Sequence, residues 1–594
     1  MPRLPHITTV LAVVAFSSSS IVKSPSNQGD NFELLILHNN DMHARFEQTS
    51  QLSGACTIAD REAGKCYGGF PRVAYVVKEA RRAAAAGEGP PVLYLNAGDT
   101  YTGTAWFTIY KWKIAAEFLN ALQPDAVSLG NHEFDNGISG LTPFIRNLTC
   151  PVLAANLILT EEPDLQSEHN LMNSVIFNIN GIKVGIIGYL TPDTKFLAKK
   201  NKVDYIEEVV AIKKEVEKLK REEVKILIAL GHSGFLKDLE IAEKVDDIDL
   251  VIGGHTNTFL WNGTAPDVEI VQGPYPTLVM QPSGRLVPAV QAYAYTKYLG
   301  KLHLIFNSDG ELINFDGNPI LLNNSIPQDP SVLAIVDRYR QSVIKISDAV
   351  VGVSSVTLDG MSCRLNECNM GNLITDAIVE KYASEYQGDG WTDAPIAVLQ
   401  GGGIRASITH VTQPFNVTQG DLFAVMPFDG NIVKITLNGS SIWKMLEHSV
   451  AEYNTMRAPG QFLQVSGLKV EYDLNKKPGK RVVRAEVICG NCQLPKYSPI
   501  NMSEMYNILT NAFLSMGGDG FSMLIGLPTI TFNYNELSCT VDYMNRTNAV
   551  HPAVEGRIII HSNGARNHGT HRTVSIFMIF IYIHLPCFRK LLID

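Results

Sequence analysis

The chain of 594 residues is 45% hydrophobic and 18% charged, an ordinary globular composition that excludes a disordered, collagen-like or coiled-coil protein. Its 59 acidic and 50 basic residues give a net charge of −9, which argues against a general nucleic-acid binder, because such a protein needs a basic face to replace the counterions of the phosphates. The length fits two large α/β domains, or three to four smaller ones, each able to bury its own core.

The N-terminus has the pattern of a secretory signal peptide. Arg3 precedes the apolar stretch 7–16 and the serine run 17–20, and this apolar stretch is too short to span a bilayer. We expect residues 1–25 to be the signal peptide. N-x-S/T sequons agree with passage through the secretory pathway, although the tripeptide also arises by chance; they begin at Asn147, Asn262, Asn323, Asn416, Asn438, Asn501 and Asn545.

Six of the nine cysteines form close pairs in the sequence, and three are isolated. In a secreted chain, close pairs favour local disulfides, whereas in the cytosol Cys489-Gly-Asn-Cys492 alone would indicate a zinc or redox site. No second CxxC motif accompanies it, so a disulfide is favoured. The pairs are Cys56/Cys66, Cys363/Cys368 and Cys489/Cys492. For the isolated Cys150 and Cys539, a mutual bond, free thiols and bonds between chains all stay open, and Cys587 lies near the C-terminus.

The first half of the chain alternates short apolar runs with polar or glycine-rich turns. Apolar runs of this length indicate strands that are buried on both faces of an α/β sheet. The clearest runs and their turns are 34–41, 92–99, 126–133, 181–189, 224–232 and 248–255. Residues 206–223 have apolar positions at helical spacing with Glu and Lys between them, which is typical of a helix with a solvated face. This pattern predicts a first α/β domain at 31–326.

A second helical pattern, 331–346, follows Pro327 and Pro330 and is expected to connect two domains within a linker at 327–346. The pattern then changes to a helix at 371–382 and β-rich segments, which are 431–439, 462–474 and 553–560. These segments predict a second α/β domain at 347–560. No internal repeat is present, which argues against a solenoid or a propeller.

Polar side chains stand at the ends of five of the predicted strands of the first domain. In an open α/β sheet, loops at the carboxyl ends of the strands converge on one crevice, so these side chains can meet. A set of His, carboxylate and amide ligands without thiolate suits zinc, manganese or iron(II) in a catalytic site. A single His after a strand is more often a structural residue than a metal ligand, so only the five groups together indicate a metal site. They are Asp41 and His43, Asp99, Asn131 and His132, His232, and His255.

The order DxH, GD, GNHE, GH, GGH resembles the calcineurin-like metallophosphoesterases. Within them, HNNDMHARFE, GNHEFDNG and GGHTN are similar to the ecto-5'-nucleotidase and apyrase family. The resemblance implies a four-layer α/β sandwich for the first domain and two divalent metal ions, with zinc expected first and manganese, calcium or magnesium as alternatives. It also implies the following roles: Asp41 and His43 hold one ion, Asn131, His232 and His255 hold the other, Asp99 bridges them, His132 and Asp135 are the catalytic pair, and Arg45 and Asn257 are phosphate-side residues.

Four segments of the second half resemble the nucleotide-binding domain of the same family, so that the likeness covers about 34–560. They are CRLNECNMGNL, GGGIR, VMPF and FLSMGGDGF. The resemblance implies that Phe428 and Phe513 sandwich the base, that Asp519 bonds the ribose hydroxyls, and that Arg364 and Arg405 grip phosphate. The family commonly has Asn before GGGIR, whereas this chain has Gln400, one methylene longer. Either the same contact or an altered base or phosphate-chain preference is compatible with that change.

The resemblance implies an extracellular 5'-nucleotidase that acts on AMP and other nucleoside monophosphates. The alternative is an apyrase that hydrolyses ATP and ADP, and a remote one is a binding protein without turnover. Because base and phosphate sites lie on opposite sides of the linker helix, we expect a hinge there that gates the substrate. A homodimer through the second domain is compatible with the resemblance.

The C-terminal tail, 561–594, has features of a lipid-anchor signal. Small residues at 562–564, a polar spacer and the apolar stretch 574–588 follow the order of a GPI signal. The final RKLLID departs from it, and an extension of a freely secreted protein is the alternative. Contact with a membrane is expected only through such an anchor.

Overall fold

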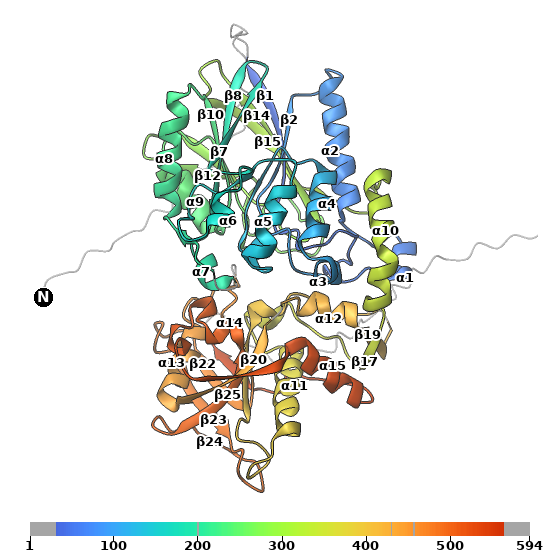
Figure 1. Ribbon diagram of the computed structural model, residues 1–594, viewed down its shortest axis with the longest axis vertical. Helices are drawn as coiled ribbons and strands as arrows, with labels where there is room; N and C mark the ends of the chain where they lie inside the picture. Colours follow the sequence, from blue (N-terminus) through green and yellow to red (C-terminus); the bar gives the residue numbers. More distant parts are fainter. Residues whose placement is uncertain (1–30, 199–200, 411, 429, 456–457, 563–594) are drawn as a thin grey trace, which may run out of the picture.

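The computed structural model describes residues 31–562 except 199–200, 411, 429 and 456–457. Figure 1 shows two domains stacked along the long axis of the molecule, with helix α10 (Pro330–Ser347) beside their junction. The predicted signal peptide, Cys587 and nearly all of the predicted anchor signal lie outside the described residues. Among the helices that the structure describes, none combines the length and apolarity needed to cross a bilayer.

The first domain is built on two sheets. The larger has the order β15-β14-β1-β2-β3-β4-β6, with β16 paired to β14, and the smaller has the order β12-β13-β11-β10-β8-β7. The strands of the larger sheet are β1 (Phe32–Asn39), β2 (Val92–Asn96), β3 (Ala126–Ser128), β4 (Val152–Leu153), β6 (Leu171–Met172), β14 (Tyr298–Phe306), β15 (Leu312–Gly317) and β16 (Ile320–Leu321). Those of the smaller are β7 (Ser174–Ile179), β8 (Ile182–Leu190), β10 (Ile226–His232), β11 (Leu250–Ile252), β12 (Thr277–Met280) and β13 (Leu286–Val290). A separate short pair is β5 (Leu157–Ile158) with β9 (Asp204–Tyr205).

The two sheets pack face to face and are each covered by helices. Leu34 and Ile36 of β1 share one apolar core with Ile226 and Ile228 of β10. Helices α2 (Phe70–Ala85), α4 (Trp112–Leu122) and α5 (Ile138–Asn147) cover the larger sheet, and α8 (Glu208–Arg221) and α9 (Phe235–Lys244) cover the smaller. Figure 1 shows α8 and α2 on opposite flanks. This is the four-layer α/β sandwich that the resemblance implied. The shorter helices are α1 (Ile58–Glu62), α3 (Ala105–Tyr110), α6 (Pro163–Gln166), α7 (Thr194–Leu197) and η1 (Asn131–Phe134).

The expected linker helix is present as α10. Asp329 caps it by accepting hydrogen bonds from the backbone N–H groups of Ser331 and Val332, and Pro330 occupies the first turn, where its missing N–H costs nothing. Val332 and Val336 are buried in the core of the first domain. The helix therefore extends that core and also contacts α12 (Gln419–Val425) of the second domain.

The second domain contains a five-stranded sheet with the order β21-β18-β25-β20-β26 and a four-stranded sheet with the order β24-β23-β22-β27. The strands are β18 (Ile396–Gln400), β20 (Asn431–Asn438), β21 (Leu463–Ser466), β22 (Leu468–Asp473), β23 (Val482–Ile488), β24 (Tyr497–Pro499), β25 (Met505–Asn511), β26 (Thr529–Asn535) and β27 (Ile558–His561), with the pair β17 (Val350–Ser354) and β19 (Phe415–Thr418). One core lies under α11 (Asn369–Glu385) and α15 (Glu536–Arg546), and another lies under α13 (Gly439–Ser449). The remaining helices are α14 (Ala512–Ser515), η2 (Ser362–Arg364), η3 (Gly401–Gly403), η4 (Gly518–Gly520) and η5 (Ser522–Leu524).

The cysteines follow the pairing that their spacing favours. Disulfides join Cys56 to Cys66, Cys363 to Cys368 and Cys489 to Cys492. Cys150 and Cys539 are buried free thiols in different domains. Of the alternatives left open by the sequence, the structure therefore has free thiols at these two positions.

Candidate active site

The five predicted turns meet at one place, but they come from two sheets and not from one. The turns after β1, β2 and β3 carry Asp41, Asp99 and Asn131, whereas His232 ends β10 and His255 follows β11. The sequence predicted convergence at the edge of a single open sheet, and that expectation was too simple. The site forms where the carboxyl ends of parallel strands in two facing sheets come together beside the core that the sheets share.

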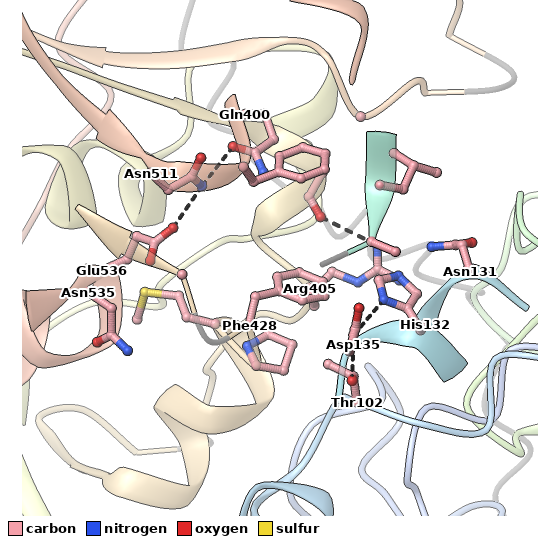
Figure 2. Close-up of a pocket in the computed structure, with 18 of the residues that line it drawn as sticks. Thr102, Asn131, His132, Asp135, Gln400, Arg405, Phe428, Asn511, Asn535 and Glu536 are labelled. Atoms are coloured by element: carbon pink, nitrogen blue, oxygen red, sulfur yellow. Dashed lines mark hydrogen bonds and ion pairs between the residues drawn. The ribbon is translucent and has the colours of Figure 1, made fainter. Parts of the chain in front are cut away.

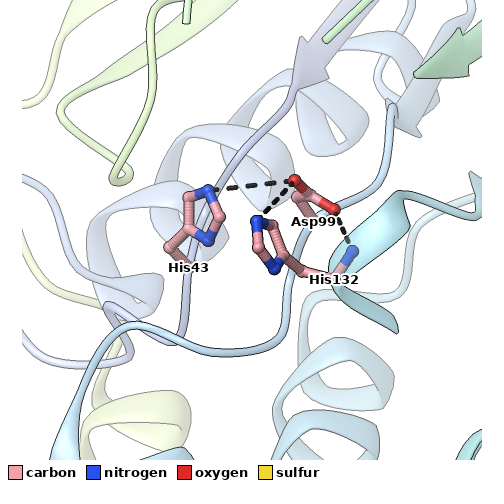
Figure 3. A group of neighbouring side chains, drawn as sticks. All are labelled: His43, Asp99 and His132. Carbon is pink, nitrogen blue, oxygen red and sulfur yellow. Dashed lines mark hydrogen bonds and ion pairs between the residues drawn. The ribbon is translucent and has the colours of Figure 1, made fainter. Parts of the chain in front are cut away.

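Asp99 lies at the centre of the cluster. Its Oδ2 atom is 2.8 Å from Nε2 of His232 and 3.9 Å from Nε2 of His43. Nε2 of His132 is 4.0 Å from the same oxygen, and Figure 3 shows His43 and His132 facing it. Ligand atoms of His43, Asp99 and His132 lie within 4.8 Å of one another, as do those of Asp99, His232 and His255. The two groups share Asp99, which is the arrangement that two neighbouring cations with a common carboxylate require.

Asp41 and Asn131 complete the cluster. Oδ1 of Asp41 is 3.8 Å from Nε2 of both His43 and His232, and Oδ1 of Asn131 is 2.9 Å from Nδ1 of His255. Within the described part of the chain, Oδ1 of Asp41 has no hydrogen-bond partner, although it is buried. Orphaned buried acceptors of this kind are costly unless something else satisfies them. The donor set therefore fits divalent cations.

Backbone carbonyls fix the orientation of two of the histidines. Nδ1 of His43 lies 2.9 Å from the carbonyl oxygen of Thr102, and Nδ1 of His232 lies 2.7 Å from that of Ala97. Since a carbonyl only accepts, each Nδ1 carries the proton and donates it. Nε2 is then the nitrogen of each ring that is left to bind a metal ion, and in both residues it lies within 4 Å of Oδ2 of Asp99.

The backbone at the cluster is strained. Four residues have φ values in the left-handed region, which residues other than glycine rarely adopt. They are Asp41 (50°), His43 (46°), Asp99 (56°) and His255 (80°). Such strain costs about 1–3 kcal/mol per residue and persists only where the surrounding fold imposes it. A Cβ atom at Gly130 would lie 2.1 Å from Oδ1 of Asp99, so glycine is required there for the two turns to approach.

The predicted pair of His132 and Asp135 is formed. Nδ1 of His132 lies 2.8 Å from Oδ2 of Asp135, which also accepts a 2.6 Å hydrogen bond from the hydroxyl of Thr102 (Figure 2). Burial lowers the pKa of His132, but the carboxylates of Asp135 and Asp99 raise it by more, so that the net shift is upward. The imidazole is thus oriented and favoured in its protonated, proton-donating form.

A cavity between the domains joins this cluster to the predicted nucleotide-binding residues. From the first domain it is lined by Asp99, Asn131, His132, Asp135 and His255, and from the second by Arg364, Gln400, Arg405, Phe428, Phe513 and Asp519. The ring of Phe428 stacks on that of His132 with centroids 5.3 Å apart, and Nη2 of Arg405 lies 3.1 Å from Nε2 of His43. Burial raises the pKa of Asp519 to about 6, although Arg364 and Arg405 oppose the rise.

Two predicted phosphate-side residues do not line this cavity. Arg45 is buried, and its Nη1 atom donates to the carbonyl oxygens of His43 and Gly103. Nη2 of Arg45 and Oδ1 of Asn257 are buried without a hydrogen-bond partner among the described residues. Arg45 thus joins the turns after β1 and β2, and a direct contact with phosphate stays a prediction for both residues.

Comparisons with known proteins agree with this geometry. Residues 34–259 match the calcineurin-like phosphoesterase family, and residues 350–525 match the 5'-nucleotidase C-terminal domain. Protein 5NUC of Lutzomyia longipalpis is 46% identical over 92% of this chain and 96% of its own length, and the 5'-nucleotidase of Homo sapiens is 42% identical over 91% and 92%. The crystal structure of a 5'-nucleotidase precursor from Thermus thermophilus superposes with a TM-score of 0.79 at 32% identity, over 89% of this chain and all of the other.

The chain belongs to the 5'-nucleotidase family. The resemblance noted in the sequence is therefore confirmed, as is the two-domain α/β architecture of a 5'-nucleotidase. The roles of single residues stay predictions, and two charged residues were missed.

The first missed residue of this 5'-nucleotidase is Glu133. Its buried carboxylate accepts hydrogen bonds from the backbone N–H groups of Asp99, Thr100 and Gly130. Burial raises its pKa to about 7. Glu133 is the last letter of GNHE, and its position two residues after the predicted ligand Asn131 was the only signal in the sequence.

The second missed residue is Asp238 of α9. Its carboxylate accepts 2.7 Å hydrogen bonds from the hydroxyl of Tyr189 and from Nε2 of Gln291, and the same Nε2 atom donates to the carbonyl oxygen of Gly254. The network fixes the turn before His255. Nothing in the sequence pattern around Asp238 distinguishes it from a solvated helix residue, so only the structure reveals this role.

Proposed function

We propose that the protein is an extracellular 5'-nucleotidase that hydrolyses AMP and other nucleoside 5'-monophosphates to a nucleoside and phosphate. The observation that carries the proposal is the single cavity that holds both the His/Asp/Asn cluster and the aromatic and arginine residues of the second domain. The names of the relatives support the same reaction.

The cluster is proposed to hold two divalent cations, with zinc as the first candidate. Asp41 and His43 would bind one ion, Asn131, His232 and His255 the other, and Asp99 both. Bound cations of this kind neutralise phosphoryl oxygens and make a water molecule more acidic. Manganese, calcium and magnesium stay alternatives, because a set of His, Asp and Asn ligands accepts several ions.

The remaining residues of the cavity have separate tasks in this proposal. His132, held by Asp135, donates a proton to the leaving 5'-oxygen, which general acid catalysis favours by about 10²–10⁴-fold. Arg364 and Arg405 bind phosphate oxygens, since a guanidinium fork matches them bidentately.

The nucleoside half of the substrate is assigned to the second domain. Phe428 and Phe513 stack on the base, an interaction worth about 1–3 kcal/mol per base in single-stranded nucleic-acid complexes. Asp519 accepts hydrogen bonds from the ribose hydroxyls. This division explains why the substrate needs both domains, because the phosphate and the base are bound by different halves of the chain.

The location outside the cell rests on the sequence features of both termini and on relatives such as the snake venom 5'-nucleotidase of Naja atra, which is 42% identical over 89% of this chain. Whether the C-terminal tail is exchanged for a lipid anchor is open. Mass spectrometry of the mature C-terminus answers that question. A dimer through the second domain stays a prediction.

The deciding experiment measures phosphate release from AMP, ADP and ATP in parallel, with purified protein and added zinc or manganese. We expect release from AMP, and we expect prolonged treatment with EDTA to abolish it until metal is restored. Hydrolysis of ATP and ADP with AMP untouched would instead establish the apyrase alternative. Binding of nucleotides without any turnover would establish the binding protein.

A further inference from the structure

Three buried polar side chains line the interdomain cavity beyond the stacking residues. They are Gln400 at the end of β18, Asn511 at the end of β25 and Glu536 at the start of α15, and each is less than 10% exposed. Figure 2 shows Glu536 on one side of Phe428 and His132 with Asp135 on the other. The three side chains therefore lie at the end of the cavity away from the metal cluster.

The hydrogen bonds of Asn511 fix the orientation of this group. Its Oδ1 atom accepts a 3.0 Å hydrogen bond from the backbone N–H of Leu514 and so caps α14. Its amide N–H₂ must then point the other way, where it donates to Oε1 of Gln400 at 3.1 Å and to Oε1 of Glu536 at 2.8 Å. Both amide hydrogens are used, so Asn511 has no further donor for a ligand.

Two groups are left facing the cavity. Because Oε1 of Gln400 accepts from Asn511, its Nε2–H₂ group is turned outward, and it has no hydrogen-bond partner among the described residues. Oε2 of Glu536 forms no hydrogen bond to another residue of the described chain, and no Lys, Arg or His there forms an ion pair with it. Burial raises the pKa of Glu536 to about 7. Above this pKa, where Glu536 is ionised, the cavity end thus offers one N–H donor and one carboxylate acceptor in a fixed order.

A nucleobase stacked on Phe428 and Phe513 would present its edge to these two groups. The edges of bases differ in the order of donors and acceptors: a 6-aminopurine or 4-aminopyrimidine has an exocyclic N–H₂ donor beside an unprotonated ring nitrogen, whereas the 6-oxo or 4-oxo base has a carbonyl beside a ring N–H. A carbonyl oxygen placed against a carboxylate leaves both acceptors unsatisfied, which is strongly unfavourable in a buried site.

We propose that Glu536 and Gln400 read the base edge and select substrates with an exocyclic amino group: Glu536 accepts from that amino group and Gln400 donates to the neighbouring ring nitrogen. The proposal rests on the proposed function and adds the base preference to it. It also gives a role to Gln400, the position at which this chain departs from the Asn common in its family: the longer side chain contacts Asn511 and through it Glu536.

The test compares kcat/KM for two pairs of substrates that differ in this feature, AMP with IMP and CMP with UMP. In the natural enzyme we expect the amino base of each pair to be favoured by about tenfold or more. Glu536→Gln should bring both ratios to one or below, because Oε1 of the carboxamide must accept from Asn511, as Oε1 of Glu536 does, so that its Nε2–H₂ group faces the base and favours a carbonyl. The exposed Glu452→Gln, outside the cavity, is the matched control and should keep the natural ratios.

The outcomes distinguish the proposal on the base edge from the proposed 5'-nucleotidase activity. Turnover of AMP with equal kcat/KM for AMP and IMP would overturn the proposal on the base edge and leave the 5'-nucleotidase intact. A ratio that Glu536→Gln leaves unchanged in a folded variant would overturn the role of Glu536. If that variant fails to fold, the ratio of kcat/KM for AMP and IMP in the natural enzyme still tests the proposal on the base edge. Absence of turnover with every monophosphate would refute the proposed function and this inference together.

Discussion

At the scale of single residues, Asp135 has two effects on His132: it orients the imidazole, and it places a negative charge beside it. One of its oxygens, Oδ2, bonds both the hydroxyl of Thr102 and Nδ1 of His132, so it fixes the imidazole and also supplies a negative charge that raises the pKa of His132. An asparagine at this position can keep the oxygen and its two contacts while removing the charge. The two effects can therefore be measured apart.

We expect Asp135→Asn to lower kcat for AMP by about tenfold or more and His132→Ala to lower it by about 10²–10⁴-fold, because the first weakens and the second removes the proton donor. KM should change little, since a group that acts mainly in the transition state contributes little to substrate binding. Steady-state kinetics on metal-loaded protein measures both constants. The exposed Asp316→Asn serves as the control. Loss of activity through KM alone would contradict the role given to this pair.

At the scale of elements, the turn after β2 and the short helix η1 are joined by Glu133. Its carboxylate accepts from N–H groups of both segments, and these segments carry Asp99 and Asn131. The two turns would otherwise hold several buried N–H groups without partners, beside a backbone that is already strained at Asp99. The position of two predicted metal ligands therefore depends on a residue that is not itself among the predicted ligands.

Glu133→Gln should lower the free energy of unfolding by about 1–3 kcal/mol, because the new amide N–H₂ faces backbone donors and leaves at least one of them unsatisfied. We also expect weaker zinc binding, since the turns that carry Asp99 and Asn131 lose their common anchor. Urea denaturation and competition with a zinc chelator measure the two effects. The exposed Glu243→Gln should show neither. Unchanged metal affinity in a destabilised variant would limit Glu133 to a role in stability.

At the scale of the whole molecule, the two domains meet over the cavity that is proposed to bind the substrate. Helix α7 packs against η4, and the ring of Phe428 rests on His132. Because Phe428 of the second domain stacks on His132 of the first, we expect that a nucleotide enters or leaves the cavity only if the domains separate. Such motions commonly limit turnover in enzymes with sites between domains.

A covalent bridge across this boundary should stop turnover. Cysteines at the exposed Lys195 of α7 and Ser522 after η4 can be joined by a bifunctional maleimide, and we expect multiple-turnover hydrolysis of AMP to fall at least about tenfold. The native Cys150 and Cys539 should not interfere, because both are buried and burial raises the pKa of each thiol. The unbridged double variant and each single variant are the controls. Full activity after complete cross-linking would exclude the motion.

Much of this architecture could be predicted along the chain. The six apolar runs of the first half overlap strands β1, β2, β3, β8, β10 and β11, and helices α8 and α10 lie where the helical spacing placed them. In the second half the segment 462–474 divides into β21 and β22 at Gly467, whose φ of 70° is a turn that the apolar pattern does not reveal. Helices such as α2, α4 and α15 were not predicted, although their apolar residues lie along one face as those of α8 do.

The sequence by itself determined the chemistry of the site: the types of ligand, their order along the chain and the presence of a second domain with aromatic and arginine residues. These follow from local composition and from short motifs. Tertiary structure decided what depends on distant residues meeting. It placed the ligands at the junction of two sheets, turned Arg45 to backbone carbonyls, and brought Gln400 within hydrogen-bonding reach of Asn511, with Glu536 beside it. Buried polar groups must find partners wherever the folded chain provides them, and no local pattern specifies which partner that will be.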